Sequence, residues 1–595
     1  MTDKNHSLKK PETGGLPFPA GWISSNPWKV EELLSAMPVE EQVRCIIQVR
    51  GKQRLDLLTL SSKAHEVMKE LPPEEAYQMI KEIGENDALP VLSLASCEQL
   101  QFIFDLEWWC GDKFQPLRAL EWLDLLDKCD ESAFLEWFQS EEFDQQVVLL
   151  QSLIKVVVKG EQEDPGEDLE GLDYFTLDGV YEIYFKVKNY EPVKNLIRLL
   201  RLENENHYFR LMETVVWYPV TLTVESAYRW RLTRTSERGI PPYEEAMEIY
   251  SRLDPEALRI DAPTLEPFMD GEPYSVAPTY PFSQLAPFTF LRDCLSLMED
   301  THRVDTLCWE MVYLANKVMV ADKRNLSDFQ VREEVVRKVL GYVNIGLQSG
   351  AEGDPARGAK ILERTWLQPL FQVGYQEVMR IKWQAENFIR NNGKFAEGLL
   401  SEGDKEQLGA LALRFPQVGD LVAQEDPLNW RDFQSDDDVR HLRTFLERWE
   451  FFIRFARHCL DLTEERMEQL FEKCDFPEHR EDMDLLTWVT TALARFTLFK
   501  QVNCEPLTEV AAKNFLEIIF LPRVFKDEPK VCNKDLIEAF RAGLLNIPMA
   551  WTSRDKEFLT GLIHECVQNL RSQFGSLNPA GPIEWKFTHG LAVKR

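Results

Sequence analysis

The 595-residue sequence lacks the histidine and cysteine arrangements that hold metal ions in helical proteins. It has nine histidines, and no two of them lie three or four residues apart, so no helix can present a pair of them to a metal. No two of its eleven cysteines form a Cys-x-x-Cys pair, and their number is odd. This pattern indicates scattered reduced thiols in a cytoplasm rather than a zinc site or a disulfide framework.

Long apolar runs and an excess of positive charge are also missing. A membrane-spanning helix needs about twenty apolar residues, whereas polar or charged residues interrupt the two most apolar stretches, 147–158 and 485–499. Lysine and arginine number 68 against 99 acidic residues, which gives a net charge of -31. Such a charge repels phosphate backbones and anionic membrane surfaces. We therefore expect a soluble cytoplasmic protein with no nucleic-acid partner and no membrane insertion.

Sequence motifs for catalysis and nucleotide binding are missing as well. Residues 353–360 resemble a phosphate loop, but no apolar strand precedes them and no Ser or Thr follows Lys360, so they predict a turn that starts a helix. Asp436, Asp437 and Asp438 precede a predicted helix at Val439, where acids cap the helix more often than they bind a cation. We predict no catalytic residue, no cofactor and no metal ligand, and binding of a divalent cation stays an unsupported alternative.

Apolar residues at three- and four-residue steps are what the sequence has in abundance. The triplet Leu-Glu-Trp occurs three times, ending at Trp108, Trp122 and Trp137, in segments typical of short stacked helices. Four longer seams of the same spacing lie within 304–318, 335–347, 442–460 and 559–570. Only residues 180–185 alternate as a strand does. The sequence predicts an all-α protein with one or two short strands at most, in which an N-terminal helical-repeat or superhelix precedes bundles of longer helices.

Prolines, acidic runs and helix breaks divide the chain into successive segments. Pro38 and Pro72 are 34 residues apart, as are the predicted N-caps Ser96 and Asp130, which suggests a repeated helix pair. Helix breaks are expected at 350–355 and 391–404. The predicted segments are a flexible tail (1–27), an N-terminal helical-repeat domain (28–160), an acidic linker (161–175), a middle helical segment (176–254), a proline-rich connector (255–288), a helical domain (289–423), a linker (424–437), a C-terminal helical domain (438–575) and a loose tail (576–595).

Two groups of side chains are candidates for an interaction site. Arg231, Arg234 and Arg238 lie on one face of a predicted helix in an otherwise acidic chain, where they could hold a phosphorylated or carboxylate partner or pair with the chain's own acids. The tryptophans could form an interface hot spot or pack between helices. These tryptophans are Trp108, Trp109, Trp122 and Trp137.

Several segments resemble an uncharacterised family of large acidic bacterial proteins, known mainly from delta-proteobacteria. The resemblance rests on residues 50–54, 71–109, 227–239 and 314–317, and it extends over most of the chain. Residues 61–158 are also similar to the N-terminal helical superhelix of bacterial magnesium transporters, whose short helices begin with Leu-Pro-x-Glu-Glu, as Leu71 to Glu75 do. The first resemblance implies a bacterial cytoplasmic protein with a domain of unknown function, and the second implies a cation-responsive regulatory architecture without transport.

The function expected from these observations is binding rather than catalysis. Periodic apolar stripes and abundant aromatic residues favour a scaffold protein that presents helical repeats to another protein. The first alternative is a soluble regulatory module that responds to divalent cations. The second is an enzyme of unrecognised type, whose catalytic groups would converge from distant positions in the sequence.

Overall fold

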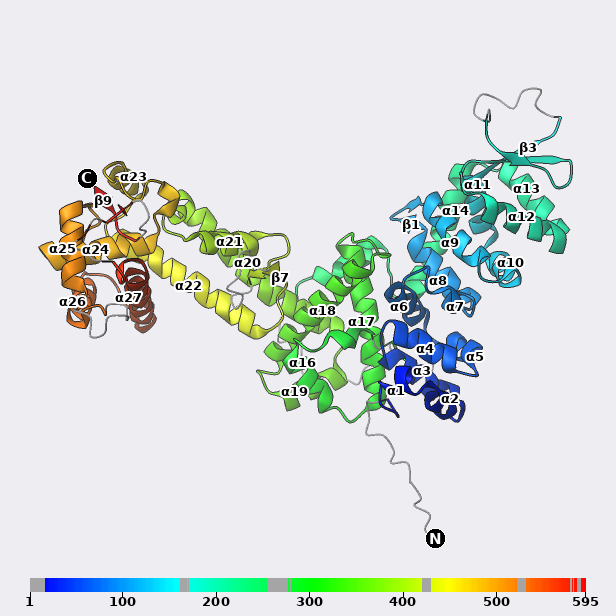
Figure 1. The fold of residues 1–595 in the computed structure, drawn as a ribbon, viewed down its shortest axis with the longest axis horizontal. Helices are drawn as coiled ribbons and strands as arrows, with labels where there is room; N and C mark the ends of the chain where they lie inside the picture. The colour runs from blue at the N-terminus through cyan, green and yellow to red at the C-terminus, as the bar shows by residue number, and fades with distance from the viewer. Residues whose placement is uncertain are drawn as a thin grey trace, which may run out of the picture. The chain divides into compact units, whose positions relative to one another are not determined.

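The computed structural model describes residues 16–160, 169, 171–253, 277–278, 280–419, 430–521, 531–577, 581, 583–585 and 590–594. Helices dominate these residues and the strands are short, so the predicted all-α class is confirmed (Figure 1). The chain divides into two compact units, Met1–Tyr375 and Gln376–Arg595. Parts of the two predicted tails, of the acidic linker, of the proline-rich connector and of the 424–437 linker lie outside the described residues. The finer segment limits given above stay predictions.

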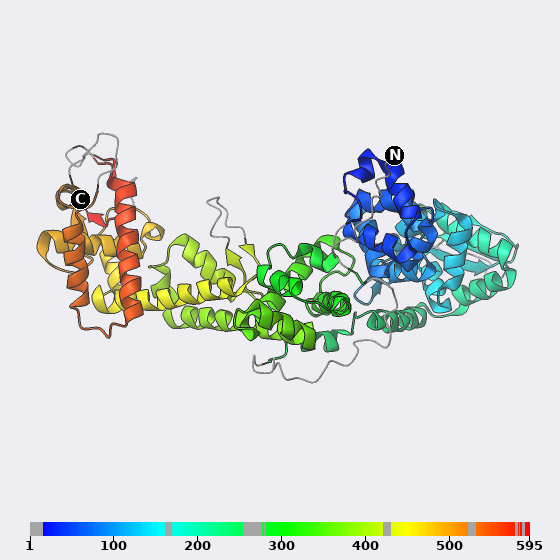
Figure 2. The ribbon, with the colours of Figure 1, turned by 90° about the horizontal axis from the view of Figure 1, so that it is seen from below.

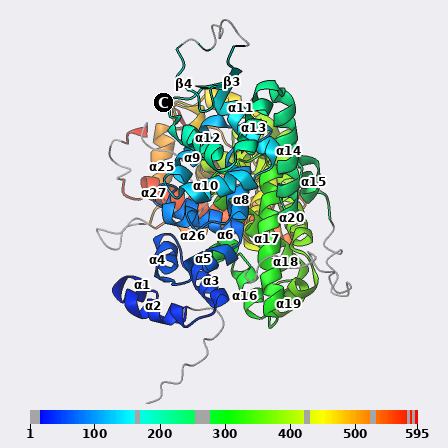
Figure 3. The ribbon, with the colours of Figure 1, turned by 90° about the vertical axis from the view of Figure 1, so that its right-hand side faces the viewer.

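The first unit begins with short helices that follow one another along the chain (Figure 3). Their starts are those expected from the sequence: Pro38 and Pro72 occupy N-cap positions, and Ser96 forms a capping box with Gln99. These helices are α1 (Trp22–Ser25), α2 (Pro27–Ser35), α3 (Val39–Gln48), α4 (Lys52–Leu60), α5 (Ala64–Glu70), α6 (Pro73–Ile83), α7 (Leu89–Leu92), α8 (Cys97–Glu107), α9 (Pro116–Asp127), α10 (Glu131–Ser140) and α11 (Phe143–Leu153).

The 34-residue spacing does not mark one repeated unit. Pro38 and Pro72 begin α3 and α6, which are three helices apart, whereas Ser96 and Asp130 begin α8 and α10, which are two helices apart. The short helices therefore stack without a uniform helix-pair period.

Strands are more numerous than the sequence predicted, although each is short. Residues 28–160 were expected to be helical throughout, but β1 (Trp109–Cys110) and β2 (Lys113–Phe114) form a hairpin, and β3 (Ile154–Val158) ends the segment. The β-branched run in β3 favours an extended chain. It pairs antiparallel with β5 (Tyr181–Phe185), the strand expected from alternation, and β5 also pairs with β4 (Tyr174–Phe175).

Helices α12, α13 and α14 follow this sheet, and longer helices complete the first unit (Figure 1). The predicted seams on α17 and α18 are buried, apart from the partly exposed Val304. The break at 350–355 is confirmed, since Asp354 caps α19. The elements are α12 (Glu191–Glu203), α13 (Glu205–Trp217), α14 (Val220–Glu237), α15 (Tyr243–Ala246), η2 (Met247–Tyr250), η4 (Tyr280–Gln284), α16 (Thr289–Ser296), α17 (Thr301–Ala321), α18 (Phe329–Gly350), α19 (Pro355–Arg364) and α20 (Leu367–Glu397).

Two glycines allow α18 and the first turns of α20 to touch through their backbones. A Cβ atom at Gly346 would lie 1.9 Å from the carbonyl oxygen of Leu370, and a Cβ at Gly374 would lie 1.9 Å from that of Tyr342. Any side chain at either position would have to push the two helices apart.

The second unit contains the last part of α20 and the remaining elements. From Gln376 onward α20 runs beside α22, where Arg443 reaches Glu377, and α24 packs against α25, α26 and α27 (Figure 2). The seams on α22 and α27 are buried as predicted. The elements are α21 (Glu402–Ala412), β6 (Val418–Gly419), β7 (Trp430–Arg431), α22 (Asp436–Cys459), α23 (Glu464–Glu472), η5 (Arg480–Asp482), α24 (Leu485–Phe499), β8 (Leu507–Thr508), α25 (Glu509–Ile519), α26 (Lys534–Leu545), α27 (Ser553–Phe574) and β9 (Val593–Lys594).

The prediction that the chain is loose from about Ser576 is wrong for residues 590–594. Strand β9 pairs in parallel with β8, and Leu591, Ala592 and Val593 are buried. The stretch is too short to show a period in the sequence, but it buries apolar surface against the helices of this unit.

Candidate functional site

The arginine stripe on α14 is paired with the chain's own groups, as one of the two alternatives describes. Arg234 makes a bidentate pair with Asp105 of α8, with Nε 2.8 Å from Oδ2 and Nη2 2.6 Å from Oδ1. Arg231 is buried and donates its Nε–H to the backbone oxygen of Asp105 at 2.6 Å. Arg238, predicted on the same helix face, lies just beyond the last residue of α14 as its C-cap and pairs with Glu98 at the start of α8. The stripe therefore joins α14 to α8.

The tryptophans lie in the core of the first unit. Trp108, Trp122 and Trp137 are fully buried around Phe104, whose ring centroid is 4.3 Å from that of Trp108 and 4.9 Å from that of Trp137. Trp109 is 3 % exposed. All four side chains thus pack between helices in this structure, which corresponds to the second of the two interpretations.

A buried carboxyl group lies next to this core and to the Asp105–Arg234 pair. Glu141 accepts a hydrogen bond from the indole N–H of Trp137 at 2.9 Å. Burial, helped by the nearby charge of Asp105, raises the pKa of Glu141 to about 7. The native state therefore holds this proton to a higher pH than the unfolded chain does, and rising pH favours unfolding.

We expect Glu141→Gln to stabilise the first unit more at pH 8 than at pH 5. Below the pKa of Glu141 in the unfolded chain, near 4.5, the carboxyl is neutral in both states and costs no stability. As the pH rises from there through about 7, its pKa in the folded protein, stability is lost. The gain in the free energy of unfolding relative to wild type should be about 2 kcal/mol larger at pH 8 than at pH 5. Urea denaturation at both pH values measures it. Glu142→Gln, at the exposed neighbouring position, is the control, and an equal effect of both variants would contradict the assignment.

The cysteine side chains do not suggest a nucleophile. Ten of the eleven thiols are buried or partly buried, and Cys110 in β1 is exposed. Burial raises the pKa of Cys45, Cys459 and Cys532 to about 11, which leaves little thiolate at neutral pH.

The acidic triplet at the start of α22 caps its helix. Ser435 and Asp438 form a capping box, and Asp438 also binds Arg431 through two N–H groups at 2.7 and 2.9 Å. Arg431, together with backbone N–H groups, lowers the pKa of Asp438 despite its burial. Among the described residues, no three histidine, cysteine or acidic side chains are grouped so that they could hold a metal ion.

An exposed apolar turn between α13 and α14 is a feature that the sequence reasoning missed. All six residues from Trp217 to Leu222 are exposed. The apolar side chains among them are exposed by 65 % (Trp217), 53 % (Tyr218), 54 % (Val220) and 52 % (Leu222). We name residues 217–222 the apolar turn. Their signal in the sequence was an apolar run that crosses a helix-breaking proline, where no helical face can bury it.

One buried side chain, Gln151, makes hydrogen bonds to the backbone at and just before the apolar turn. Gln151, at 4 % exposure, donates from its Nε2 to the carbonyl oxygens of Tyr218 at 2.9 Å and Val215 at 3.4 Å. Its Oε1 accepts a hydrogen bond from Thr223 at 2.7 Å. Lys186 in turn donates to the backbone oxygen of Gln151 at 2.7 Å. The turn is thus fixed on both sides of Pro219, while its apolar side chains point into solvent.

A family model for proteins of unknown function, DUF6178, matches residues 31–594. The chain belongs to this family. The resemblance to an uncharacterised family is thereby confirmed, whereas the bacterial origin and the likeness of residues 61–158 to a magnesium-transporter superhelix stay predictions. No curated protein and no solved structure matches this DUF6178 chain. Within the described part of the chain, no helix has both the length and the apolar character needed to cross a bilayer.

Proposed function

We propose that this protein is a non-catalytic scaffold that binds another protein through the apolar turn. The observation that carries the proposal is the exposure of Trp217, Tyr218, Val220 and Leu222 on a backbone pinned by Gln151. Exposed apolar clusters on a folded surface mark interaction sites. Tryptophan and tyrosine supply much of the binding energy at such sites.

The fixed backbone of the turn supports binding with little loss of entropy. A turn that is already held in one conformation does not have to be ordered when the partner arrives. The hydrogen bonds of Gln151 and Thr223 provide this order in the free protein. We therefore expect a partner that offers apolar surface to these side chains.

Photo-crosslinking in the native host tests this function. A photoreactive amino acid at position 217 should capture one reproducible partner protein. With that partner purified, Trp217→Ser with Leu222→Ser should weaken binding by roughly 30-fold or more. Neither replacement should alter stability, because both side chains are already exposed.

Leu202→Ser is the matched control, since Leu202 is 70 % exposed on the neighbouring helix α12. Equal loss of binding in the control, or unchanged binding in the double variant, would refute the role of the apolar turn. A failure to capture any reproducible partner would count against the scaffold function itself.

A further inference from the structure

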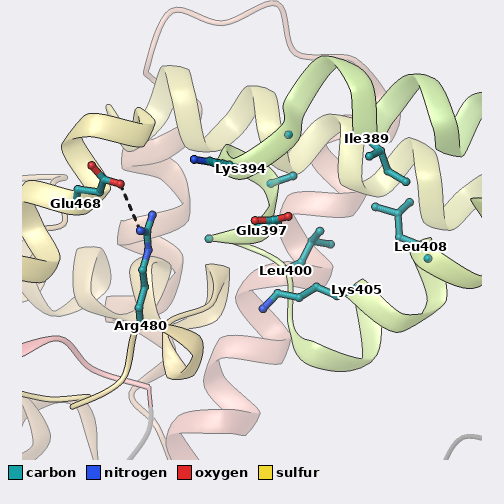
Figure 4. Close-up of a pocket in the computed structure, with 12 residues that line it drawn as sticks. Ile389, Lys394, Glu397, Leu400, Lys405, Leu408, Glu468 and Arg480 are labelled. Carbon is teal, nitrogen blue, oxygen red and sulfur yellow. Dashed lines mark hydrogen bonds and ion pairs between the residues drawn. The ribbon is translucent and has the colours of Figure 1, made fainter.

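The second unit contains a cavity of about 640 Å³ where α20 ends. This volume falls in the range of small-molecule sites. Its walls come from the last turns of α20, the following loop, α21, α23 and η5 (Figure 4).

Two glycines line this cavity and have open space at their Cβ positions. Gly393 has φ +42°, which interrupts α20 within the predicted break at 391–404. A Cβ atom at Gly393 or at Gly409 would meet no atom within 4 Å. Because Gly409 lies inside α21, where glycine costs roughly 1 kcal/mol relative to alanine, its presence there is not explained by helix stability.

The charged lining differs from the rest of the chain. Three cations, Lys394, Lys405 and Arg480, face two carboxylates in a protein whose net charge is -31. The charged ends of the three cations surround the space beside Glu397 and Leu400 (Figure 4).

Part of this positive charge is available to a ligand. Lys405 pairs with Glu402 of the same helix at 3.2 Å. Arg480 and Glu468 are 3.3 Å apart, but both side chains are about half exposed, so this pair is weak. Lys394 and Glu397 make no ion pair with any described residue, although they are one helical turn apart on α20.

Apolar side chains form the remaining surface of the cavity. Leu400 and Leu408 are 3 % and 6 % exposed, and Ile389 is 38 % exposed at the rim. The exposed part of Ile389, with small contributions from Leu400 and Leu408, can contact the hydrocarbon part of a ligand, while Lys394 and Arg480 meet its charge.

We propose that this cavity binds a small organic anion with an apolar body. The charged group of the ligand lies against Lys394 and Arg480, and its apolar body lies along the side of the cavity formed by Ile389, Leu400 and Leu408. This site belongs to the second unit and is independent of the apolar turn of the first.

Titration calorimetry with three probes of one chain length tests the proposal: octanoate, octylammonium and 1-octanol. Octanoate should bind about tenfold more tightly than octylammonium, with octanol between them. Equal binding of the two ions, tighter binding of octylammonium, or no heat with octanoate at millimolar concentration would overturn it.

Two charge variants on the same helix should have opposite effects on octanoate. Lys394→Gln should weaken binding of octanoate by about three- to tenfold. Glu397→Gln should tighten binding by a similar factor, because it removes a negative charge that repels the anion. Arg390→Gln, an exposed arginine outside the lining, should leave affinity unchanged. Effects of the same sign for Lys394→Gln and Glu397→Gln would refute the proposed orientation of charge.

A variant that fills the cavity with a side chain tests whether binding can be lost while the protein stays folded. Gly409→Phe should abolish octanoate binding by occupying the cavity, while the melting temperature stays the same or rises. Gly403→Phe is the control, because Gly403 lies in the same helix, has open space at its Cβ and does not line the cavity. Unchanged binding in Gly409→Phe, or equal loss in both variants, would place the ligand elsewhere.

Discussion

Replacing Asp105 by alanine is expected to lower the free energy of unfolding of the first unit by about 3–5 kcal/mol. Asp105 is 2 % exposed and holds Arg234 through two hydrogen bonds. Burial raises the pKa of this carboxyl while Arg234 opposes the rise, so the pair offsets part of the cost of burying both charges. Without Asp105, the largely buried guanidinium of Arg234 would lose its counter-charge.

A double variant and a surface control make the measurement specific. Asp105→Leu combined with Arg234→Met should recover most of the loss, because a buried pair can be replaced by apolar groups at little cost. Glu225→Ala removes an exposed partner of Arg229 on the same helix and should change stability by less than about 0.5 kcal/mol. Urea denaturation, with hydrogen exchange in α8 and α14, provides the readout. If Asp105→Ala lowers the stability no more than Glu225→Ala does, the Asp105–Arg234 pair does not hold α14 to α8.

Replacing Gly346 by alanine is expected to cost about 3 kcal/mol, although alanine is the better helix former. The added methyl group would collide with the backbone oxygen of Leu370, which cannot rotate away as a side chain could. Gly374→Ala should cost a similar amount through the oxygen of Tyr342. The two losses should be less than additive in the double variant, because one separation of α18 from α20 relieves both collisions.

Gly561→Ala is the control for helix propensity, since Gly561 lies within α27 with open space at its Cβ. It should stabilise the protein by about 0.5–1 kcal/mol. Thermal denaturation measures the stability of Gly346→Ala and of Gly561→Ala. A gain in stability for Gly346→Ala would contradict the close approach of the two helices.

The all-α class and much of the helix placement could be predicted because they depend on local signals. Proline and serine at Pro38, Pro72 and Ser96 mark helix starts by their own backbone and hydrogen-bonding chemistry. The seams on α18 and α22 are buried because a helix must cover an apolar stripe.

The features that involve distant residues could not be predicted. Spacing placed Arg231 and Arg234 on one face of a helix, but their partner Asp105 lies more than a hundred residues away in the chain. The Gly346–Gly374 contact and the cavity near Gly393 likewise arise from helix packing. The apolar turn was missed for a different reason: its composition is that of a core, and only the fold shows that its side chains are exposed among the described residues.

The distribution of thiols gives a practical advantage at the bench. Cys110 is the exposed cysteine, so a maleimide dye should attach there preferentially in the unaltered sequence. The next residue, Gly111, offers its carbonyl oxygen to Arg231 at 3.3 Å. A fluorophore on Cys110 would thus report loosening of the contact between α8 and α14, and no cysteine would have to be introduced.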